Sequence, residues 1–269
     1  MTSPLHNSST RWAHVHLDRE TERKAALETI VLLNAVKDQA HQARLHHREN
    51  ELFWEFSFDQ FKPEHIDFIL ATIGTGEVRI SIDNGRVKLE ETAIPALWHV
   101  QNGMTHSLVL SIMPPAVGEA INKINGTLKI PNETPERVFA APSILLELQA
   151  VLEKTNLEYF THDPAFSIEL TRQPLESQDR DFLEGILGVG SIEIWLSGFA
   201  SAHIRSTTVR GLWNSRLLNN AGKLLLDSIV VARIPPEVPT APEELDDTVK
   251  IASETLHWIE QDLERGALG

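Results

Sequence analysis

The sequence predicts an α+β fold in which one structural unit is present twice and is followed by a C-terminal helix. Each unit is expected to contain a helix, a strand, a short helix and a three-stranded antiparallel meander. Three features lead to this prediction: two segments of the chain resemble each other, each segment ends in alternating strand-type patterns joined by turn signals, and an amphipathic stripe runs close to the C-terminus. The chain of 269 residues is long enough for two such units.

The internal repeat is clearest around two Gly-x-Gly pairs, Gly74 with Gly76 and Gly188 with Gly190. Around each pair, similar residue types recur in the same order and at a near-constant offset. The matching segments are 67–82 with 181–196, Thr92 with Thr207, Leu97-Trp98 with Leu212-Trp213, Pro114-Pro115 with Pro235-Pro236, Ile30-Val31-Leu32 with Ile144-Leu145-Leu146, and Glu55 with Glu169. A common order maintained over this length predicts an internal duplication.

Each unit is expected to begin with an amphipathic helix, over 21–43 in the first copy and 142–154 in the second. Pro142 suits the first turn of a helix, where its missing N–H would have had no partner within the helix. A strand with two-residue alternation follows, at 53–58 and at 166–171, and a short apolar helix then leads to the Gly-x-Gly turn.

Turn-forming residues divide the last part of each unit into strands. Asp83-Asn84-Gly85 and Gln101-Asn102-Gly103 favour hairpin turns in the first copy, because Asn, Asp and Gly tolerate the positive φ that such turns require. Ser197-Gly198 and 219–222 take these places in the second copy. We expect three antiparallel strands in each meander, ended by the Pro-Pro pair, which cannot continue a ladder.

The C-terminal segment predicts an amphipathic helix that starts at Thr240-Ala241-Pro242-Glu243, a capping-box pattern with proline just inside the helix. Its apolar stripe consists of Leu245, Val249, Ala252, Leu256, Ile259 and Leu263. Its other face carries the acidic residues Glu243, Glu244, Asp246, Asp247, Glu254, Glu260, Asp262 and Glu264. The predicted divisions of the chain are an N-terminal arm (1–20), a first unit (21–121), a linker (122–140), a second unit (141–240) and the terminal helix (241–269).

The composition excludes several classes of function. Lys and Arg number 24 against 38 Asp and Glu, and the formal net charge of −14 disfavours a nucleic-acid partner, whose phosphates need cations. The absence of cysteine excludes disulfides, a cysteine nucleophile and thiolate-ligated zinc or iron–sulfur clusters. The N-terminus is polar and no apolar run is long enough to span a bilayer, which predicts a cytoplasmic protein without a membrane partner.

No motif for catalysis or cofactor binding is present. Both Gly-x-Gly pairs are expected between a helix and a strand, whereas a dinucleotide-binding fingerprint leads from a strand into a helix. Tight structural turns therefore explain Gly74, Gly76, Gly188 and Gly190 better than phosphate binding does. The sequence also lacks a P-loop and a nucleophile elbow. These observations predict a binding protein with no cofactor and no catalytic residues.

Histidines are the best candidates for a metal site. His41, His46 and His47 cluster with Glu51 at the end of the first predicted helix, and the histidines of His14-Val15-His16 would share one face of a strand. In a helix, only His47 and Glu51 have the i, i+4 spacing that directs two ligands to one ion. A metal- or cofactor-handling protein using His41, His46 and His47 is the alternative function, whereas exposed histidines favoured by the helix dipole are the simpler interpretation.

Trp195 is the residue that most suggests an interaction surface. Its counterpart in the first copy is a serine, so Trp195 is expected on the polar face of a strand, near Arg205 and Arg210. It is either an anchor for a partner or a contact with the other unit. Trp213 is the counterpart of Trp98, which favours a place in the core and also keeps Trp213 among the candidate binding residues.

The segment running from Leu187-Gly188-Val189-Gly190 through Thr207 and Leu212-Trp213-Asn214 to Ile234-Pro235-Pro236 resembles the HupH/HyaF/HoxQ family, accessory proteins encoded with uptake nickel–iron hydrogenases. The resemblance covers most of the chain and is clearest over 183–263. It implies a chaperone-like protein that binds the precursor of the hydrogenase small subunit, and other maturation proteins, while iron–sulfur clusters are assembled or protected and before twin-arginine export. It implies no catalytic residues.

The acidic face of the terminal helix suggests how such a partner would be attracted. Glu243, Glu244, Asp246 and Asp247 would attract a basic signal segment and increase the rate of encounter. A further alternative is a structural subunit of a larger maturation complex, in which the repeated units pair edge to edge with a partner.

Overall fold

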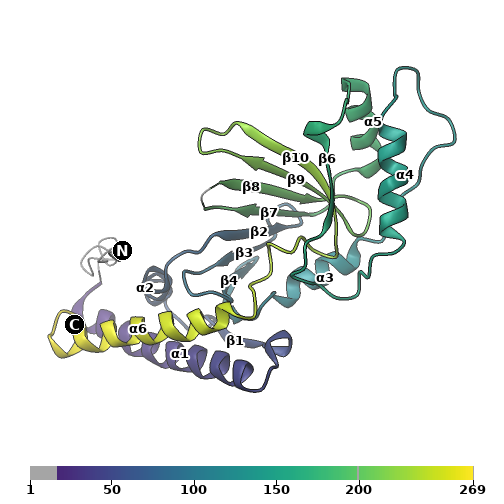
Figure 1. Ribbon diagram of the computed structural model, residues 1–269. Coiled ribbons are helices and arrows are strands. Elements are labelled where there is room, and N and C mark those ends of the chain that lie inside the picture. The colour runs from purple at the N-terminus through teal and green to yellow at the C-terminus, as the bar shows by residue number, and fades with distance from the viewer. Residues whose placement is uncertain (1–16, 199, 269) are drawn as a thin grey trace, which may run out of the picture. The chain divides into compact units, whose positions relative to one another are not determined.

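The computed structural model describes residues 17–198 and 200–268 (Figure 1). The chain divides into two compact units. The first consists of Met1–Gly76, Leu89–Pro114 and Thr240–Gly269, and the second of Glu77–Lys88 and Pro115–Pro239. His14-Val15-His16 and most of the predicted N-terminal arm lie outside the described residues.

The first unit combines three α-helices with antiparallel strands. Its elements are α1 (Arg19–Leu45), the short 3-10 helix η2 (Glu49–Glu51), β1 (Trp54–Ser57), α2 (Pro63–Ile73), β3 (Val87–Glu91), β4 (Leu97–Asn102), β5 (Thr105–Leu110) and α6 (Glu244–Glu264). The strands follow the order β1-β5-β4-β3, and the first two residues of β3 are counted with the second unit. Figure 1 shows α1 and α6 side by side.

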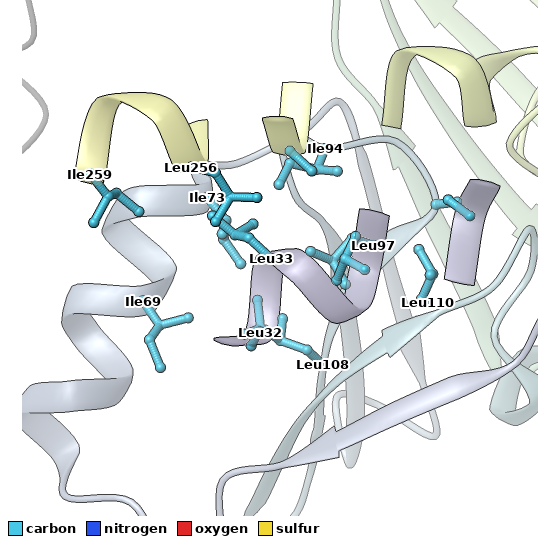
Figure 2. Packing of buried hydrophobic residues seen from close by; sticks show 14 of the residues in the cluster. Leu32, Leu33, Ile69, Ile73, Ile94, Leu97, Leu108, Leu110, Leu256 and Ile259 are labelled. Atoms are coloured by element: carbon cyan, nitrogen blue, oxygen red, sulfur yellow. The ribbon is translucent and has the colours of Figure 1, made fainter. Parts of the chain in front are cut away.

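Apolar side chains from α1, α2, α6 and the strands form the core of the first unit. Figure 2 shows how they meet: Leu32 and Leu33 come from α1, Ile69 and Ile73 from α2, Leu256 and Ile259 from α6, and Leu97, Leu108 and Leu110 from the strands. Each such side chain contributes about 1.5–3 kcal/mol by its removal from water. In the terminal helix, Leu245, Ala252 and Ile259 are fully buried, as the spacing of the stripe predicts.

The second unit places helices against a longer set of strands. Its elements are β2 (Val78–Ile82), α3 (Pro115–Lys123), α4 (Ala141–Leu152), β6 (Phe166–Glu169), the 3-10 helix η3 (Leu170–Arg172), α5 (Ser177–Leu187), β7 (Ile192–Leu196), β8 (Ser201–Ser206), β9 (Leu212–Leu218) and β10 (Leu224–Val231). The strands follow the order β2-β7-β8-β9-β10-β6 and pair antiparallel. Leu145 and Leu148 of α4 meet Leu183 and Leu187 of α5 in the core, together with Ile229 of β10.

The buried carboxylate of Asp179 connects α5 to the start of α4. Its Oδ1 accepts the N–H groups of Phe139, Ala140 and Ala141, each at 2.9 Å, and its Oδ2 accepts that of Glu176 at 3.3 Å. Burial acts to raise the pKa of Asp179, but the four N–H donors together hold that pKa below its usual range. One carboxylate therefore caps the first turn of α4 and also stabilises the first turn of α5.

Both halves of the chain contain the series helix, strand, helix, four strands, helix. Equivalent groups also make equivalent hydrogen bonds: the indole N–H of Trp98 donates to the carbonyl of Ser111 at 2.9 Å, and that of Trp213 to the carbonyl of Ala232 at 3.1 Å. Further matching pairs are Gly76 N to Glu91 O and Gly190 N to Ser206 O, and Thr92 N to Leu97 O and Thr207 N to Leu212 O.

The prediction of three strands in each meander is wrong, because each half has four. The expected middle strand is broken at a turn in which a threonine hydroxyl accepts the N–H two residues later: Thr92 from Ile94 at 3.2 Å, and Thr207 from Val209 at 3.1 Å. Ala96, with a φ of 62°, then adopts the left-handed conformation in the first turn. A threonine turn of this kind has no Asn-Gly signal in the sequence, so the alternation of apolar and polar residues predicts one continuous strand where the structure has two.

Two helix starts differ from the sequence expectation. Pro115 begins α3, although the Pro-Pro pair is predicted only to end the meander; proline is favoured at the first helical position as well. The predicted capping box of the terminal helix is not formed. The Thr240 hydroxyl donates to Glu91 Oε1 at 3.1 Å, and Glu244 accepts the N–H of Ala241 at 2.7 Å. In the part of the chain that the structure describes, no helix is both long and apolar enough to cross a membrane.

Candidate functional site

One side of the second unit's sheet carries Trp195, and we call it the arginine face. It consists of Arg79 on β2, Glu193 and Trp195 on β7, His203 and Arg205 on β8, and Asn214 and Arg216 on β9. The register pairs Arg79 with Trp195, Trp195 with His203, His203 with Arg216, Glu193 with Arg205, and Arg205 with Asn214. Residues directly opposite each other in an antiparallel sheet point to the same side, so these seven side chains share one surface.

The centre of the arginine face is a flat aromatic pair. Trp195 is 39% exposed, and its ring stacks on that of His203 with centroids 5.2 Å apart and planes at 9°. Burial is the main reason that the pKa of His203 is lowered; the Glu193 carboxylate acts against this shift, and Arg205 and Arg216 add to it. The imidazole is therefore mainly neutral at pH 7 and supports the exposed indole from one side.

Next to this pair, the arginine face contains a small pocket with both polar and apolar walls. The pocket has a volume of about 70 Å³, and Arg205, Asn214 and Arg216 line it together with Glu184 at the edge of α5. The Nη2 atom of Arg216 lies 3.5 Å from Glu184 Oε1, a long and weak contact for an ion pair in which Glu184 is largely exposed. The two arginines thus keep most of their hydrogen-bonding capacity for another acceptor.

Three buried polar atoms of this face have no hydrogen-bond partner among the described residues: His203 Nε2, Asn214 Oδ1 and Arg216 Nε. The nearest carboxylate oxygens are too far for hydrogen bonds, at 3.9 Å between His203 Nε2 and Glu193 Oε2 and at 3.6 Å between Arg216 Nε and Asp227 Oδ1. Because an unpartnered buried polar atom costs free energy, these three atoms are sites where water or another molecule would complete the hydrogen bonds.

Two other predicted binding residues lie elsewhere in the second unit. Arg210 contacts the segment after α4, with Nη2 at 3.5 Å from the Leu157 carbonyl and 3.5 Å from Glu158 Oε1. Trp213 is 1% exposed and its indole N–H is bonded to a carbonyl inside the unit. Of these four candidates, Trp195 and Arg205 lie on the arginine face, whereas Arg210 and Trp213 do not.

The alternation of His203 with Arg205 and of Asn214 with Arg216 shows that each pair shares a side of its own strand. Sequence reasoning selects only Arg205 among these four, because the pairing that brings them beside Trp195 is set by strand register. Register is not readable from composition or from the alternation of a single strand.

The four acidic candidates at the start of α6 have different surroundings. Asp246 makes a two-pronged contact with Arg44 of α1, at 3.1 Å to Nε and 3.0 Å to Nη2, and the hydrogen bond from Arg44 lowers the pKa of Asp246. Glu244 accepts a backbone N–H as described above. All four residues are exposed, and Glu243 and Asp247 are the two carboxylates that a partner could meet without breaking the contacts of Glu244 and Asp246.

The glycines of both Gly-x-Gly pairs lie in tight helix-to-strand turns. Gly74 and Gly188 follow α2 and α5 with φ of 68° and 62°, in the left-handed region that favours glycine. At Gly76 a Cβ atom would collide with the Thr92 carbonyl oxygen, and at Gly190 with the Ser206 hydroxyl. The requirement for glycine at these four positions thus has a local steric cause.

His41 lies within α1 and His46 and His47 follow it, and these histidines are not arranged as one metal site with Glu51. Helix α1 ends at Leu45 and His47 has a φ of 52°, so His47 and Glu51 do not lie one helical turn apart as the spacing suggests. Glu51 instead pairs with Arg48 at 2.6 Å. Within 17–198 and 200–268, no group of three His, Cys, Asp or Glu side chains is placed to hold a metal ion.

A second surface of interest lies in the first unit. Phe58, Phe61 and Met104 line an open pocket of about 380 Å³ together with Asp67 and His106. The Met104 side chain at the turn between β4 and β5 is 95% exposed. The aromatic walls of this pocket, Phe58 and Phe61, come from the segment after β1. No motif in the sequence indicates that this segment meets the β4–β5 turn.

Comparison with known proteins gives consistent relatives. Residues 138–259 match the family described as HupH hydrogenase expression protein, C-terminal conserved region. The hydrogenase expression/formation protein HoxQ of Cupriavidus necator is 27% identical over 202 residues, covering 73% of this chain and 70% of that protein. The hydrogenase-1 operon protein HyaF of Escherichia coli is 27% identical over 203 residues, covering 71% and 68%.

Among solved structures, the hydrogenase expression protein HupH from Thiobacillus denitrificans is 24% identical, with a TM-score of 0.38 and coverage of 45% of this chain and 95% of that chain. The matched family region begins at the start of α4 and ends within α6, so it contains Asp179, the Gly188–Gly190 turn and all of the arginine face except Arg79. Residues 138–259 thus match the C-terminal conserved region of the HupH hydrogenase expression proteins, and about 70% of the chain is similar to hydrogenase expression and formation proteins.

Proposed function

We propose that this protein is a chaperone-like accessory factor that binds the precursor of a nickel–iron hydrogenase small subunit in the cytoplasm, before export and while its iron–sulfur clusters are assembled. The observation that carries the proposal is the family match, since the relatives are named for hydrogenase expression and formation. This supports a role in hydrogenase maturation, and the proposal adds the partner and the mode of action.

The absence of cysteine supports a role through protein contacts and not through cluster chemistry. Iron–sulfur clusters are held mainly by cysteine thiolates, which this chain cannot supply. A protein that assists cluster assembly without thiolates can bind the polypeptide that will carry the cluster. The exposed Trp195 and the neighbouring arginines provide a surface of the kind that protein interfaces use. We therefore propose binding, and not catalysis, as the activity.

The test of this proposal is co-purification from cells that express the small-subunit precursor with and without its signal peptide. We expect the tagged full-length chain to retain the precursor in at least one form. Dependence on the signal peptide would assign a role in the timing of export, whereas binding without it would assign the cluster-bearing body of the subunit as the client. If neither form co-purifies while an unrelated tagged protein gives the same background, the proposed partner is wrong.

Charge reversal at the accessible end of α6 is expected to slow the encounter with a basic signal segment. The double variant Glu243→Lys/Asp247→Lys should reduce the association rate several-fold at low salt, and the difference should fade above about 0.5 M salt, where the Debye length is only about 3–5 Å. Asp246 is left intact because its change would break the pair with Arg44.

The matched control for this charge reversal is Glu133→Lys/Glu136→Lys, which makes the same change of charge at exposed positions between α3 and α4. Stopped-flow association measured with the precursor distinguishes the two variants. Equal rates for both would show that α6 has no special part in the encounter.

We also infer that the two halves arose by duplication, because their element order, tryptophan contacts and threonine turns agree. In this proposal 21–121 and 141–240 are the two copies, joined by the linker 122–140 and extended by the helix 241–269.

A further inference from the structure

We propose that the arginine face of the second unit is a docking surface for an acidic, extended segment of a partner protein. The carboxylates of that segment would bind Arg205 and Arg216, and an apolar side chain would rest on Trp195. The inference goes beyond the proposed function, because it concerns the chemistry of the bound segment and holds for any partner that carries one.

The charge of the arginine face is opposite to that of the chain. Its seven residues include three arginines and one glutamate, whereas the whole chain has a formal net charge of −14. Asp227 of β10 lies directly opposite Arg216 and points to the same side, but it is buried and lies 3.6 Å from both Arg216 and Arg180, so that Arg180 offsets its charge. Glu184 at the pocket edge is largely exposed and only weakly paired. A local positive surface on an acidic protein is complementary to carboxylates at short range, inside the Debye length of about 8 Å at physiological salt.

The unpartnered polar atoms indicate a peptide and not a simple anion. Arg216 Nε and, in the matching tautomer, His203 Nε2 are donors that a carboxylate would satisfy, whereas Asn214 Oδ1 is an acceptor that needs a donor. A peptide offers both, since its backbone N–H groups donate and its side-chain carboxylates accept. A nucleic-acid phosphate group offers acceptors only.

The size and the aromatic wall of the surface fit the same occupant. The pocket of about 70 Å³ has room for a carboxylate with a water molecule, because one water occupies about 30 Å³ in the liquid. Trp195 is held flat by His203 and is 39% exposed, and Val189 at the edge of the pocket is 64% exposed. Tryptophan and arginine are the side chains most enriched at the energetic centres of protein interfaces.

The test uses the purified full-length chain and fluorescence anisotropy of a short labelled peptide in which Glu alternates with Leu. Comparison probes are the same peptide with Lys in place of Glu and a single-stranded oligonucleotide. The acidic peptide is expected to bind with the lowest Kd, and Arg205→Glu/Arg216→Glu to raise that Kd by about tenfold or more. The matched control, Arg86→Glu/Arg172→Glu, changes two exposed arginines outside the face and should leave the Kd within about twofold.

Arg216 faces the buried Asp227, so the charge reversal Arg216→Glu can disturb folding. Trp195→Ala and Arg205→Gln therefore provide a second series of variants, which leave this contact intact. Both should weaken the acidic peptide by several-fold with an unchanged urea midpoint. Equal binding of the Lys peptide, tighter binding of the oligonucleotide, no binding of any probe, or equal loss in the control pair would each overturn the inference. A chain that binds the acidic peptide but not the small-subunit precursor would sustain this inference and contradict the proposed function.

Discussion

Replacing Asp179 with alanine is expected to lower the free energy of unfolding by about 3 kcal/mol or more, one of the two largest stability effects that we predict for a single substitution. The fully buried carboxylate accepts four backbone N–H groups at the starts of α4 and α5. Alanine would leave these donors without this acceptor, and the N–H of the buried Ala141 would be unpaired where water does not reach it. Urea denaturation followed by circular dichroism measures the difference.

The control for this substitution is Asp181→Ala, an exposed aspartate two residues further along the same helix, which should change stability by less than about 0.5 kcal/mol. The pH dependence gives an independent check. The pKa of Asp179 is lowered in the folded chain, so its stabilisation is complete above the ordinary aspartate pKa of about 4 and is lost as the pH falls through the folded value. The difference in the free energy of unfolding between the wild-type chain and Asp179→Ala should therefore be constant from neutral pH to about pH 4 and decrease below it. A difference that increases in acid would contradict the assigned role.

Replacing Gly190 with alanine is expected to destabilise the chain by about 2–4 kcal/mol. The new Cβ would collide with the Ser206 hydroxyl and lie 2.5 Å from the Thr207 carbonyl oxygen. The Ser206 hydroxyl accepts the N–H of Ile192 at 3.1 Å, so moving it aside would also disturb the start of β7. The turn from α5 into β7 would have to open, and the midpoint of thermal or urea unfolding would fall.

The control for Gly190→Ala is Gly185→Ala in the preceding helix, which is expected to increase the stability of the chain. Gly185 lies in α5, and apart from the neighbouring backbone of the helix itself no heavy atom of the described residues lies within 4 Å of the position that the alanine methyl group would take. Alanine there should therefore stabilise the chain by about 0.5–1 kcal/mol through its better helix propensity. Destabilisation of similar size at both glycines would show that the turn geometry is not the cause.

Much of the fold follows from local patterns in the sequence. Gly74, Gly188 and the Asp83-Asn84-Gly85 turn predict where the chain reverses, and the structure has positive φ at each. The stripe of the terminal helix predicts its buried side. The threonine turns could not be predicted from such patterns, because they depend on a hydrogen bond to a threonine side chain and not on a characteristic pair of turn residues. The start of α3 could not be predicted either, because a Pro-Pro pair is compatible both with the end of a strand and with the beginning of a helix.

The candidate site could be predicted only in part. Trp195 is recognisable because it stands on the predicted polar side of its strand, where the similar segment of the first half has a serine, and Arg205 because it is close in the chain. His203, Asn214 and Arg216 join them through the register of three strands. Trp213 and Asp246 show the converse limit: the sequence identifies the residue but not its contacts, which are the core in one case and Arg44 in the other.

The proposed role in cluster assembly is tested most directly by measuring the affinity of the purified chain for the small-subunit precursor in two states, without and with its iron–sulfur clusters. We expect a complex with the cluster-free precursor and an affinity at least about tenfold lower for the cluster-loaded form, since an assembly factor must release its client. Equal affinity for both states, or binding of the cluster-loaded form alone, would contradict a role during cluster assembly.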